Sequence, residues 1–479
     1  MEHNLDKPLF RDKKTNRLKA SPDLYHLVDE PEGQFYRNIF PYSTIPTIPF
    51  NDRMVPMQTA REAWITDTSF RDGQQARPPY AVNDIVELYK LLHDLGGPNG
   101  MIRQTEFFLY SNRDREAMEK CMALDFKFPE ITSWVRATKG DFELAKKAGI
   151  KETGILTSVS DYHIFKKMKT DRRKVLDQYL GIVKDALSAG ILPRCHFEDI
   201  TRADFYGFVV PFATELMTLA RDAHVPIKIR ACDTLGLGIT YPGSSLPRSV
   251  QGTIYGLREY AGVPGEQLEW HGHNDFYKAL VNASTAWLYG CSAVNTTILG
   301  FGERTGNTPL EGMCVEYAQL FGTDNGMDIS VITKIRDYLE EHTNTIIPSN
   351  MPFVGKDFNT TRAGIHADGL LKDEEIYNIF DTTKILNRPP EVMITDKSGT
   401  AGICAWINVY FNLDKPKEIR KDDPGVKEMY DWTLKEYEEG RITAISDDEL
   451  VELVKKHLPA VYNEKVVTDK LVKIKPRTK

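Results

Sequence analysis

Residues 268–275 read LEWHGHND, a short β-prone run in which one glycine separates two histidines. Successive side chains of a β-strand point to opposite faces, so His271 and His273 are expected to project from the same side. Two imidazoles that converge in this way form part of a metal-chelating site. Because histidines with this spacing also occur as hydrogen-bonded core residues, the remaining ligands have to be sought elsewhere in the chain.

Seven further β-prone runs lie between Ala63 and Gly326, and segments with helical spacing of apolar residues separate the runs. Eight strand-and-helix repeats in about 260 residues are typical of an α/β protein with a (β/α)8 TIM barrel. A doubly wound open sheet is the structural alternative. The seven runs are WITDTSF (64–70), IRQTEFFL (102–109), ITSWVRA (131–137), ETGILTSV (152–159), ILPRCHFED (191–199), IKIRACDT (227–234) and AVNTTILG (293–300).

The rest of the chain is expected to form appendages to a barrel that spans residues 63–326. Residues 1–62 are polar and dotted with proline, which suits an N-terminal arm lying over another surface. A linker or subdomain is expected over residues 327–412, and a C-terminal helical region over residues 413–479. In that smaller α-rich portion, Ser446 and Glu449 match a helix-capping box.

The composition limits the classes of function. The chain of 479 residues is 41% hydrophobic and 27% charged, and its net charge of −7 argues against nucleic acid as the main partner. No run is long and apolar enough for a membrane span, and the N-terminus lacks the apolar run of a signal peptide. The six scattered cysteines indicate buried, reduced thiols. These features predict a cytoplasmic enzyme with no membrane or nucleic-acid partner.

Polar side chains gather at the ends of the predicted strands, where the active sites of TIM barrels form. Asp72 could give a metal a carboxylate oxygen, and Arg71 could neutralise negative charge on a substrate oxygen. An adjacent arginine and aspartate can also form a simple surface ion pair. The other strand-end candidates are Glu106, Arg136, Glu198, Thr234 and, in a glycine-rich turn after the eighth strand, Asn307.

The ligand types indicate which metal the site would take. Two histidines, an aspartate and an asparagine amide oxygen, without a thiolate, suit a divalent ion: Mn²⁺ or Co²⁺ first, with Mg²⁺ or Zn²⁺ as alternatives. Such an ion keeps positions open for the ketone and carboxylate oxygens of a 2-oxo acid. Together with Arg71, it would polarise the ketone for attack by a carbon nucleophile.

Four motifs resemble those of the DRE-TIM metallolyases, and specifically their Claisen-condensing branch, which includes 2-isopropylmalate, homocitrate, citramalate and Re-face citrate synthases. The similarity spans about residues 63–400 and implies a TIM barrel that uses acetyl-CoA as co-substrate. The motifs are TDTSFRDGQQ (66–75), HGHND (271–275), GERTGN (302–307) and AGIHADG (363–369).

The resemblance assigns the metal site residue by residue. Asp72, His271 and His273 match the metal ligands of the family, with Asn307 near the metal. Arg71 matches the arginine that contacts the keto oxygen.

The same resemblance implies substrate-binding and catalytic roles. Glu106 completes the Asp-Arg-Glu signature, Thr234 resembles the threonine that binds the keto acid's carboxylate, and Arg136 resembles the arginine that homocitrate synthases use on the distal carboxylate. His366 resembles a histidine that the C-terminal subdomain lends to the active site, commonly that of the partner in a homodimer. Glu198 matches the glutamate beside that histidine. The pair would remove a methyl proton from acetyl-CoA, and the enolate would attack the ketone.

The expected 2-oxo acid is oxaloacetate, which would give citrate and CoA. The segment EFFLYSNRDREA (106–117) looks most like Re-face citrate synthases, and its aromatic rings and Arg113 suit a short dicarboxylic acid. The chain departs from other members at Gln74, where glutamate is usual, and at Ser398–Gly402, where arginine and histidine are missing. Homocitrate synthase, acting on 2-oxoglutarate, is the first alternative, followed by a 2-isopropylmalate or citramalate synthase. A lyase of the 3-hydroxy-3-methylglutaryl-CoA type and a silent binding protein are the other classes.

Overall fold

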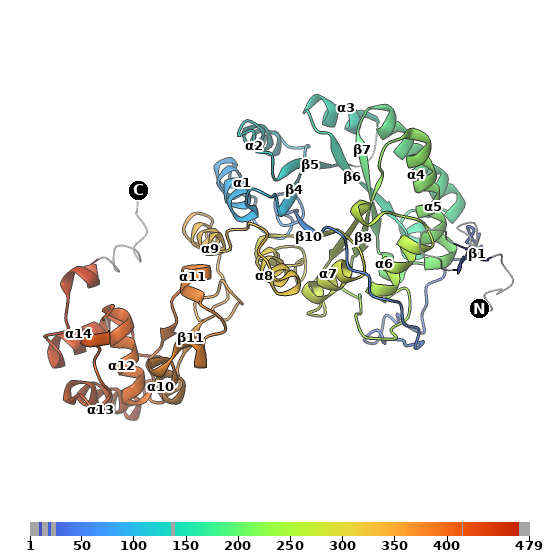
Figure 1. The fold of residues 1–479 in the computed structure, drawn as a ribbon. Coiled ribbons are helices and arrows are strands. Elements are labelled where there is room, and N and C mark those ends of the chain that lie inside the picture. Colours follow the sequence, from blue (N-terminus) through green and yellow to red (C-terminus); the bar gives the residue numbers. More distant parts are fainter. Residues whose placement is uncertain (1–8, 12–17, 21–24, 136–138, 414, 469–479) are drawn as a thin grey trace. The chain divides into compact units, whose positions relative to one another are not determined.

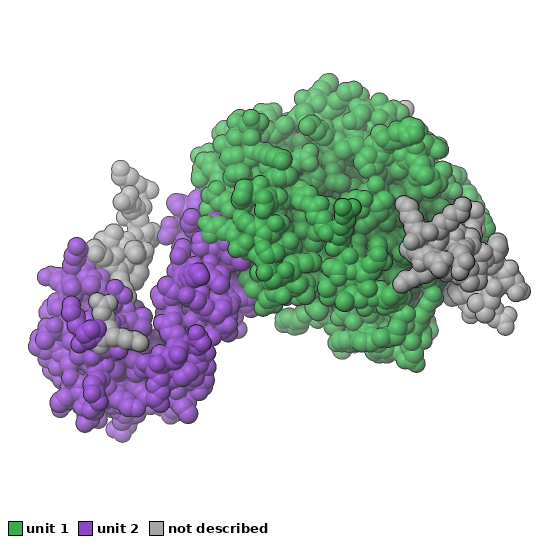
Figure 2. All heavy atoms as spheres, viewed as in Figure 1, with its two compact units in different colours: residues 1–328 green, residues 329–479 purple. Residues whose placement is uncertain are grey.

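The computed structural model describes residues 9–11, 18–20, 25–135, 139–413 and 415–468, and Figure 1 shows its fold. The chain divides into two compact units, residues 1–328 and residues 329–479, which Figure 2 colours separately. Each unit has a hydrophobic core of its own.

Unit 1 contains a closed barrel of eight parallel strands in the order β10-β3-β4-β5-β6-β7-β8-β9. Each predicted run forms one of these strands, so the predicted TIM barrel is confirmed and the open sheet is excluded. A helix follows each strand and packs outside the barrel (Figure 1). The strands are β3 (Trp64–Asp67), β4 (Ile102–Phe107), β5 (Glu130–Val135), β6 (Glu152–Ser158), β7 (Leu192–Glu198), β8 (Lys228–Asp233), β9 (Leu268–Gly272) and β10 (Ala293–Thr296). The helices are α1 (Val82–Gly96), α2 (Asn112–Met122), α3 (Lys139–Lys147), α4 (Arg172–Ser188), α5 (Val210–Ala223), α6 (Val250–Glu259), α7 (Ala279–Leu288) and α8 (Leu310–Phe321).

Helix α1 illustrates why the outer layer is helical. Its buried side chains include Ile85, Leu88 and Leu92, which recur every three or four residues and so form one apolar face toward the barrel. Gly97 ends the helix with φ at 65°. A Cβ at this position would lie 1.9 Å from the carbonyl oxygen of Gly326, so only glycine fits.

The barrel interior contains ion pairs as well as apolar side chains. Arg194 on β7 contacts Glu106 on β4 at 2.5 Å and Glu152 on β6 at 2.9 Å. Arg230 on β8 contacts Glu269 on β9 at 2.5 Å. Because β4 and β7 are not neighbours in the sheet, the Arg194–Glu106 pair crosses the interior of the barrel.

The N-terminal arm lies along the barrel of its own chain. Strands β1 (Leu9–Arg11) and β2 (Leu18–Ala20) form an antiparallel pair, and residues 25–62 are irregular. Backbone hydrogen bonds run from the amide of Val28 to the Gly207 carbonyl at 3.0 Å and from that of Asn51 to the Gly243 carbonyl at 3.0 Å. These bonds tie the arm to the segments that follow β7 and β8.

Unit 2 is mainly helical. Its core is formed by α12, α13 and α14, with Ile403, Ile407, Met429 and Val454 buried between them. The predicted capping box is confirmed at the start of α14, where Ser446 and Glu449 each bond the other's backbone amide. The elements are α9 (Val331–His342), β11 (Thr360–Thr361), α10 (Gly364–Lys372), α11 (Thr382–Leu386), β12 (Glu391–Val392), α12 (Gly399–Tyr410), α13 (Pro424–Glu438) and α14 (Asp447–His457).

Two expectations from the composition can be compared with the structure. All six cysteines lie within the described residues and are free and buried. Among the helices of the described residues, none combines the length and the apolar character that a membrane span requires.

Candidate active site

Asp72, His271 and His273 converge at the barrel end where the strands terminate. His271 is on β9, His273 directly follows that strand, and Asp72 is in the turn after β3. The two Nε2 atoms are 3.2 Å apart, and Asp72 Oδ2 lies 3.7 Å from His271 Nε2 and 4.0 Å from His273 Nε2. All three side chains are buried. Three potential ligand atoms within such distances can share one metal ion.

The hydrogen bonds around the cluster indicate a metal site and not a set of buried polar groups that satisfy one another. Asp72 Oδ2 and Asn307 Oδ1 are buried oxygens without a hydrogen-bond partner among the described residues. Asn307 pairs with His273 in an isolated β-bridge, and its Nδ2 donates to the Phe301 carbonyl at 2.9 Å. Buried polar oxygens are rarely left without a partner, so these two are well suited to complete a ligand set.

The protonation states of the three side chains also favour metal binding. Burial, reinforced by the neighbouring His273, lowers the pKa of His271 to about 3, and burial also lowers the pKa of His273. Burial alone would raise the pKa of Asp72, but neighbouring groups, first among them the positively charged Arg71, lower that pKa overall. Near neutral pH, the cluster therefore offers two neutral imidazoles and one carboxylate, which are the forms that bind metal.

Arg71 joins this cluster to the barrel interior. Its Nε donates to Glu106 Oε1 at 2.8 Å, and one terminal nitrogen donates to Asp72 Oδ1 at 3.2 Å. Burial would raise the pKa of Glu106, but Arg230, Arg71 and Arg194 hold it well below its usual range. The Glu106 carboxylate is thus a fixed negative partner that orients the Arg71 guanidinium beside the candidate metal site.

Glu198 ends strand β7, and Thr234 directly follows the neighbouring strand β8. Oε2 of Glu198 accepts hydrogen bonds from the Ser158 hydroxyl and from His163 Nδ1, the latter at 2.9 Å. The Thr234 hydroxyl oxygen accepts the backbone amide of Asp199 at 2.8 Å, and the hydroxyl donates to the Cys232 carbonyl at 3.5 Å. Both side chains therefore lie at the barrel end where substrate is expected.

The remaining two predicted site residues are His366 and Arg136. His366 lies on α10 in unit 2, where its ring stacks obliquely on Tyr377 with centroids 4.4 Å apart. Arg136 lies outside the described residues. Their predicted roles therefore remain predictions.

Sequence reasoning missed several side chains that support the site. Asn295 Oδ1 lies 2.8 Å from His271 Nδ1, so it accepts that proton and leaves the Nε2 lone pair of His271 free. Arg194, Arg230 and Glu269 fill the interior below Arg71. The alternation of charged and apolar residues along β7, β8 and β9 was an available signal, because period-two charges on a barrel strand indicate a polar interior.

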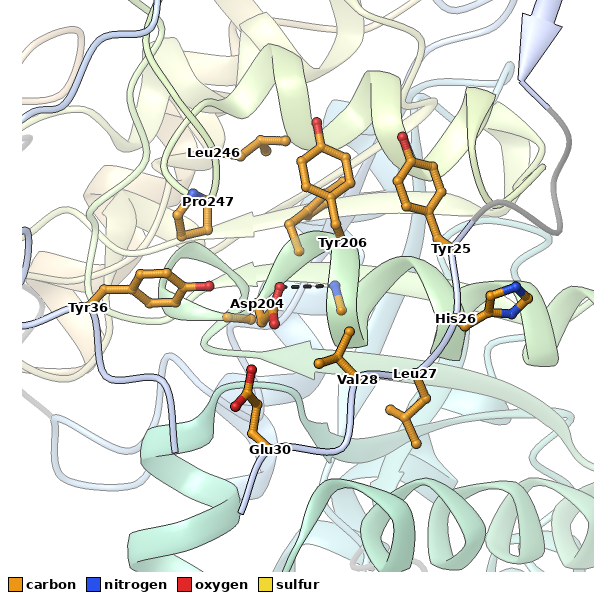
Figure 3. A pocket seen from close by; sticks show the side chains of 13 residues that line it. Tyr25, His26, Leu27, Val28, Glu30, Tyr36, Asp204, Tyr206, Leu246 and Pro247 are labelled. Carbon is orange, nitrogen blue, oxygen red and sulfur yellow. Dashed lines mark hydrogen bonds between the residues drawn. The ribbon is translucent and has the colours of Figure 1, made fainter. Parts of the chain in front are cut away.

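A separate cavity of about 420 Å³ lies between the N-terminal arm and the loops after β7 and β8 (Figure 3). Tyr36 and Val28 of the arm face Asp204 and Tyr206 across it, and Asp204 accepts the Gly207 amide at 2.9 Å. Its lining contains none of the predicted site residues. This cavity is therefore distinct from the candidate active site, which is identified by the chemistry of its side chains.

The chain belongs to the HMGL-like family, whose model matches residues 62–339, and the predicted relation to the DRE-TIM enzymes is thereby confirmed. It is 59% identical over 435 residues to the Citrate (Re)-synthase of Syntrophus aciditrophicus (strain SB), covering 91% of this chain and 69% of that protein. Identity to the Citrate (Re)-synthase of Clostridium kluyveri is 54% over 443 residues, with coverages of 92% and 98%. The 2-phosphinomethylmalate synthase of Streptomyces hygroscopicus is 35% identical over 431 residues, with coverages of 89% and 96%.

Proposed function

We propose that this chain is a Re-face citrate synthase, which condenses acetyl-CoA with oxaloacetate and water to give citrate and CoA. The observation that carries the choice of substrate is the identity of 59% and 54%, over more than nine tenths of this chain, to two Citrate (Re)-synthases. The buried cluster of Asp72, His271 and His273 beside Arg71 supports a reaction in which a ketone is activated.

A divalent metal, Mn²⁺ or Co²⁺ in our proposal, would be held by Asp72, His271, His273 and Asn307 and would act as a Lewis acid on the keto acid. Arg71 supplies a fixed positive charge next to the keto oxygen, where negative charge develops as the carbon–carbon bond forms. We assign the Thr234 hydroxyl, directly after β8, to binding the keto acid's carboxylate. The roles of Glu106 and Arg136 are to orient Arg71 and to bind the distal carboxylate, respectively.

The methyl protons of acetyl-CoA are weakly acidic, so a positioned base is needed. We assign proton removal to His366 together with Glu198. The methyl carbon then bonds to the keto carbon of oxaloacetate, and hydrolysis of the thioester releases CoA. We also propose a cytoplasmic homodimer in which His366 serves the partner's site; the six free thiols support a reducing compartment.

The test is the release of free CoA from acetyl-CoA with a panel of 2-oxo acids, with and without added Mn²⁺ and after chelation. Release with oxaloacetate that is lost on chelation, and lost in Asp72→Asn, supports the proposal. Preference for 2-oxoglutarate or 2-oxoisovalerate overturns the choice of substrate. Stereospecific cleavage of citrate made from labelled acetyl-CoA distinguishes addition to the Re face from addition to the Si face.

A further inference from the structure

Among the described residues, hydrogen bonds reach only one of the two carboxylate oxygens of Glu198. Its Oε2 accepts hydrogen bonds from the Ser158 hydroxyl and from His163 Nδ1 at 2.9 Å, and Lys167 Nζ lies 3.5 Å away. Among the described residues, no hydrogen bond reaches Oε1, and that oxygen is not among the buried atoms that lack a partner. The side chain is 19% exposed. Oε1 is therefore the oxygen that remains accessible to a bound molecule.

His163 is placed by an unusual turn of helix. Residues Tyr162–Lys167 form a π-helical turn in the segment between β6 and α4, and such turns occur frequently at functional sites. The backbone amide of His163 donates to the Ser160 carbonyl at 3.0 Å, while the Ser160 hydroxyl donates to Asp199 Oδ2 at 2.5 Å. The turn is thus tied to the residue that follows Glu198, which fixes the imidazole relative to the carboxylate.

The charge of Glu198 follows from the same contacts. Burial would raise the pKa of this carboxyl, but the hydrogen bond and charge of His163 and the bond from Ser158 lower it to about 2. Near neutral pH the group is a carboxylate with one oxygen saturated by donors and the other free. Such an arrangement holds a carboxylate in one rotamer without blocking its reactive oxygen.

We propose that His163 is a positioning residue for the condensation: its Nδ1–H holds Glu198 so that Oε1 faces the acetyl-CoA methyl group and the histidine that shares the proton. The proposal deepens the function given above and rests on it. No group of the metal cluster takes part in this contact, so metal binding does not depend on His163.

The test compares His163→Ala with His163→Asn, whose side-chain amide can donate from nearly the position of Nδ1. A lost hydrogen bond to a charged group lowers kcat by roughly 10- to 100-fold. We expect this loss in His163→Ala, with the KM of the 2-oxo acid and the bound metal unchanged, and recovery of most of kcat in His163→Asn. Wild-type kcat in His163→Ala, or no recovery in His163→Asn, overturns the proposal.

His342→Ala is the control for removal of a histidine, because His342 is 54% exposed and lies in unit 2. Crystal structures of the two His163 variants give a readout that does not depend on turnover. Glu198 should leave its rotamer in His163→Ala and keep it in His163→Asn, whereas an unmoved Glu198 in His163→Ala contradicts the positioning role. Failure of the wild-type protein to use oxaloacetate would reject the proposed function, and the structures would still decide the role of His163.

Discussion

Asn295 determines which nitrogen of His271 carries the proton. Its Oδ1 accepts from Nδ1 at 2.8 Å, and its Nδ2 donates to the Thr66 hydroxyl at 3.0 Å, so the amide is held in one orientation on β10. A neutral imidazole with its proton on Nδ1 presents a lone pair on Nε2. The residue that prepares the ligand is thus on a different strand from the ligand itself.

Replacing Asn295 by Ala should lower the affinity for Mn²⁺ on the order of 10- to 100-fold, because the imidazole of His271 loses its orienting acceptor. Titration of the apoprotein with Mn²⁺, followed by calorimetry, measures this affinity. Asn282→Ala is the matched control, since Asn282 is also a buried asparagine of unit 1 but bonds the Gly238 carbonyl. Equal Mn²⁺ affinity in the Asn295 and Asn282 variants would contradict the prediction.

Glu311 on α8 is a buried carboxyl outside the candidate site. Burial raises its pKa from 4.5 to about 7, and one oxygen accepts the Leu299 amide at 3.0 Å. Between these two pH values the folded chain keeps a proton that the unfolded chain has lost. The free energy of unfolding therefore falls as the pH rises through this range, by at most about 3 kcal/mol.

Glu311→Gln should remove this dependence, because glutamine keeps the accepting oxygen and never ionises. Relative to wild type, the variant should gain stability as the pH rises from about 4.5 to about 8. Urea unfolding at a series of pH values measures the difference. The control is Glu316→Gln, on the same helix but partly exposed, whose free energy of unfolding should follow the wild-type dependence on pH. If the curve of Glu311→Gln also ran parallel to that of wild type, Glu311 would not be protonated in the folded chain.

Strand β7 shows how one element serves three purposes. Arg194, His196 and Glu198 are two residues apart and therefore project from the same face. Arg194 pairs with Glu106 in the interior, His196 is packed against β6, and Glu198 ends at the accessible edge. The packing against β6 depends on Gly154, where an added Cβ would lie 2.5 Å from His196 Nε2.

Gly154→Ala should therefore destabilise unit 1 by about 1–3 kcal/mol, because the new methyl group would force buried side chains to move. Gly181→Ala should instead increase the free energy of unfolding. Gly181 lies within α4 with nothing within 4 Å of the added Cβ, so alanine should stabilise the helix by up to about 1 kcal/mol. Thermal or urea unfolding of both variants measures the signs, and equal effects would refute the account of β6 and β7 packing.

At the scale of the whole molecule, the proposed groups are divided between two units. The metal cluster and Glu198 belong to unit 1, and His366 belongs to unit 2. Consider a homodimer in which His366 of each subunit serves the site of the other. In a mixed dimer of an Asp72→Asn subunit and a His366→Ala subunit, both substitutions would fall in the same one of the two sites. The other site would contain only intact groups.

Coexpression of these two variants, with different tags to isolate mixed dimers, tests the exchange. The isolated mixed dimers should have about half of the wild-type activity, because one of their two sites is intact. Each variant expressed alone should be nearly inactive and serves as the control. Activity in mixed dimers no greater than in the parents would place His366 in the site of its own subunit.

Much of the fold could be predicted from the sequence because its signals are local. The spacing of apolar residues predicted helices between the β-prone runs, as α1 confirms, and each run became a strand. His271 and His273 could be paired because the period of a strand places them on one face. Asp72 was joined to them by the rule that barrel strands end together.

The supporting contacts could not be predicted because they join residues far apart in the chain. His163 and Glu198 are separated by 35 positions, and Arg194 and Glu106 by 88. Neither separation has a periodicity that a sequence pattern could reveal. Their meeting depends on the order and register of the strands and on the closure of the barrel.

The sequence by itself determined the repeating strands and helices, the ligand types of the metal site and the family, since these depend on periodicity and on short motifs. Only the tertiary structure decided that Asn295 orients His271, that Glu106 orients Arg71 and that His163 holds Glu198. The reason is physical: a hydrogen bond requires donor and acceptor within about 3 Å, and only the closed barrel brings side chains of different strands to that distance.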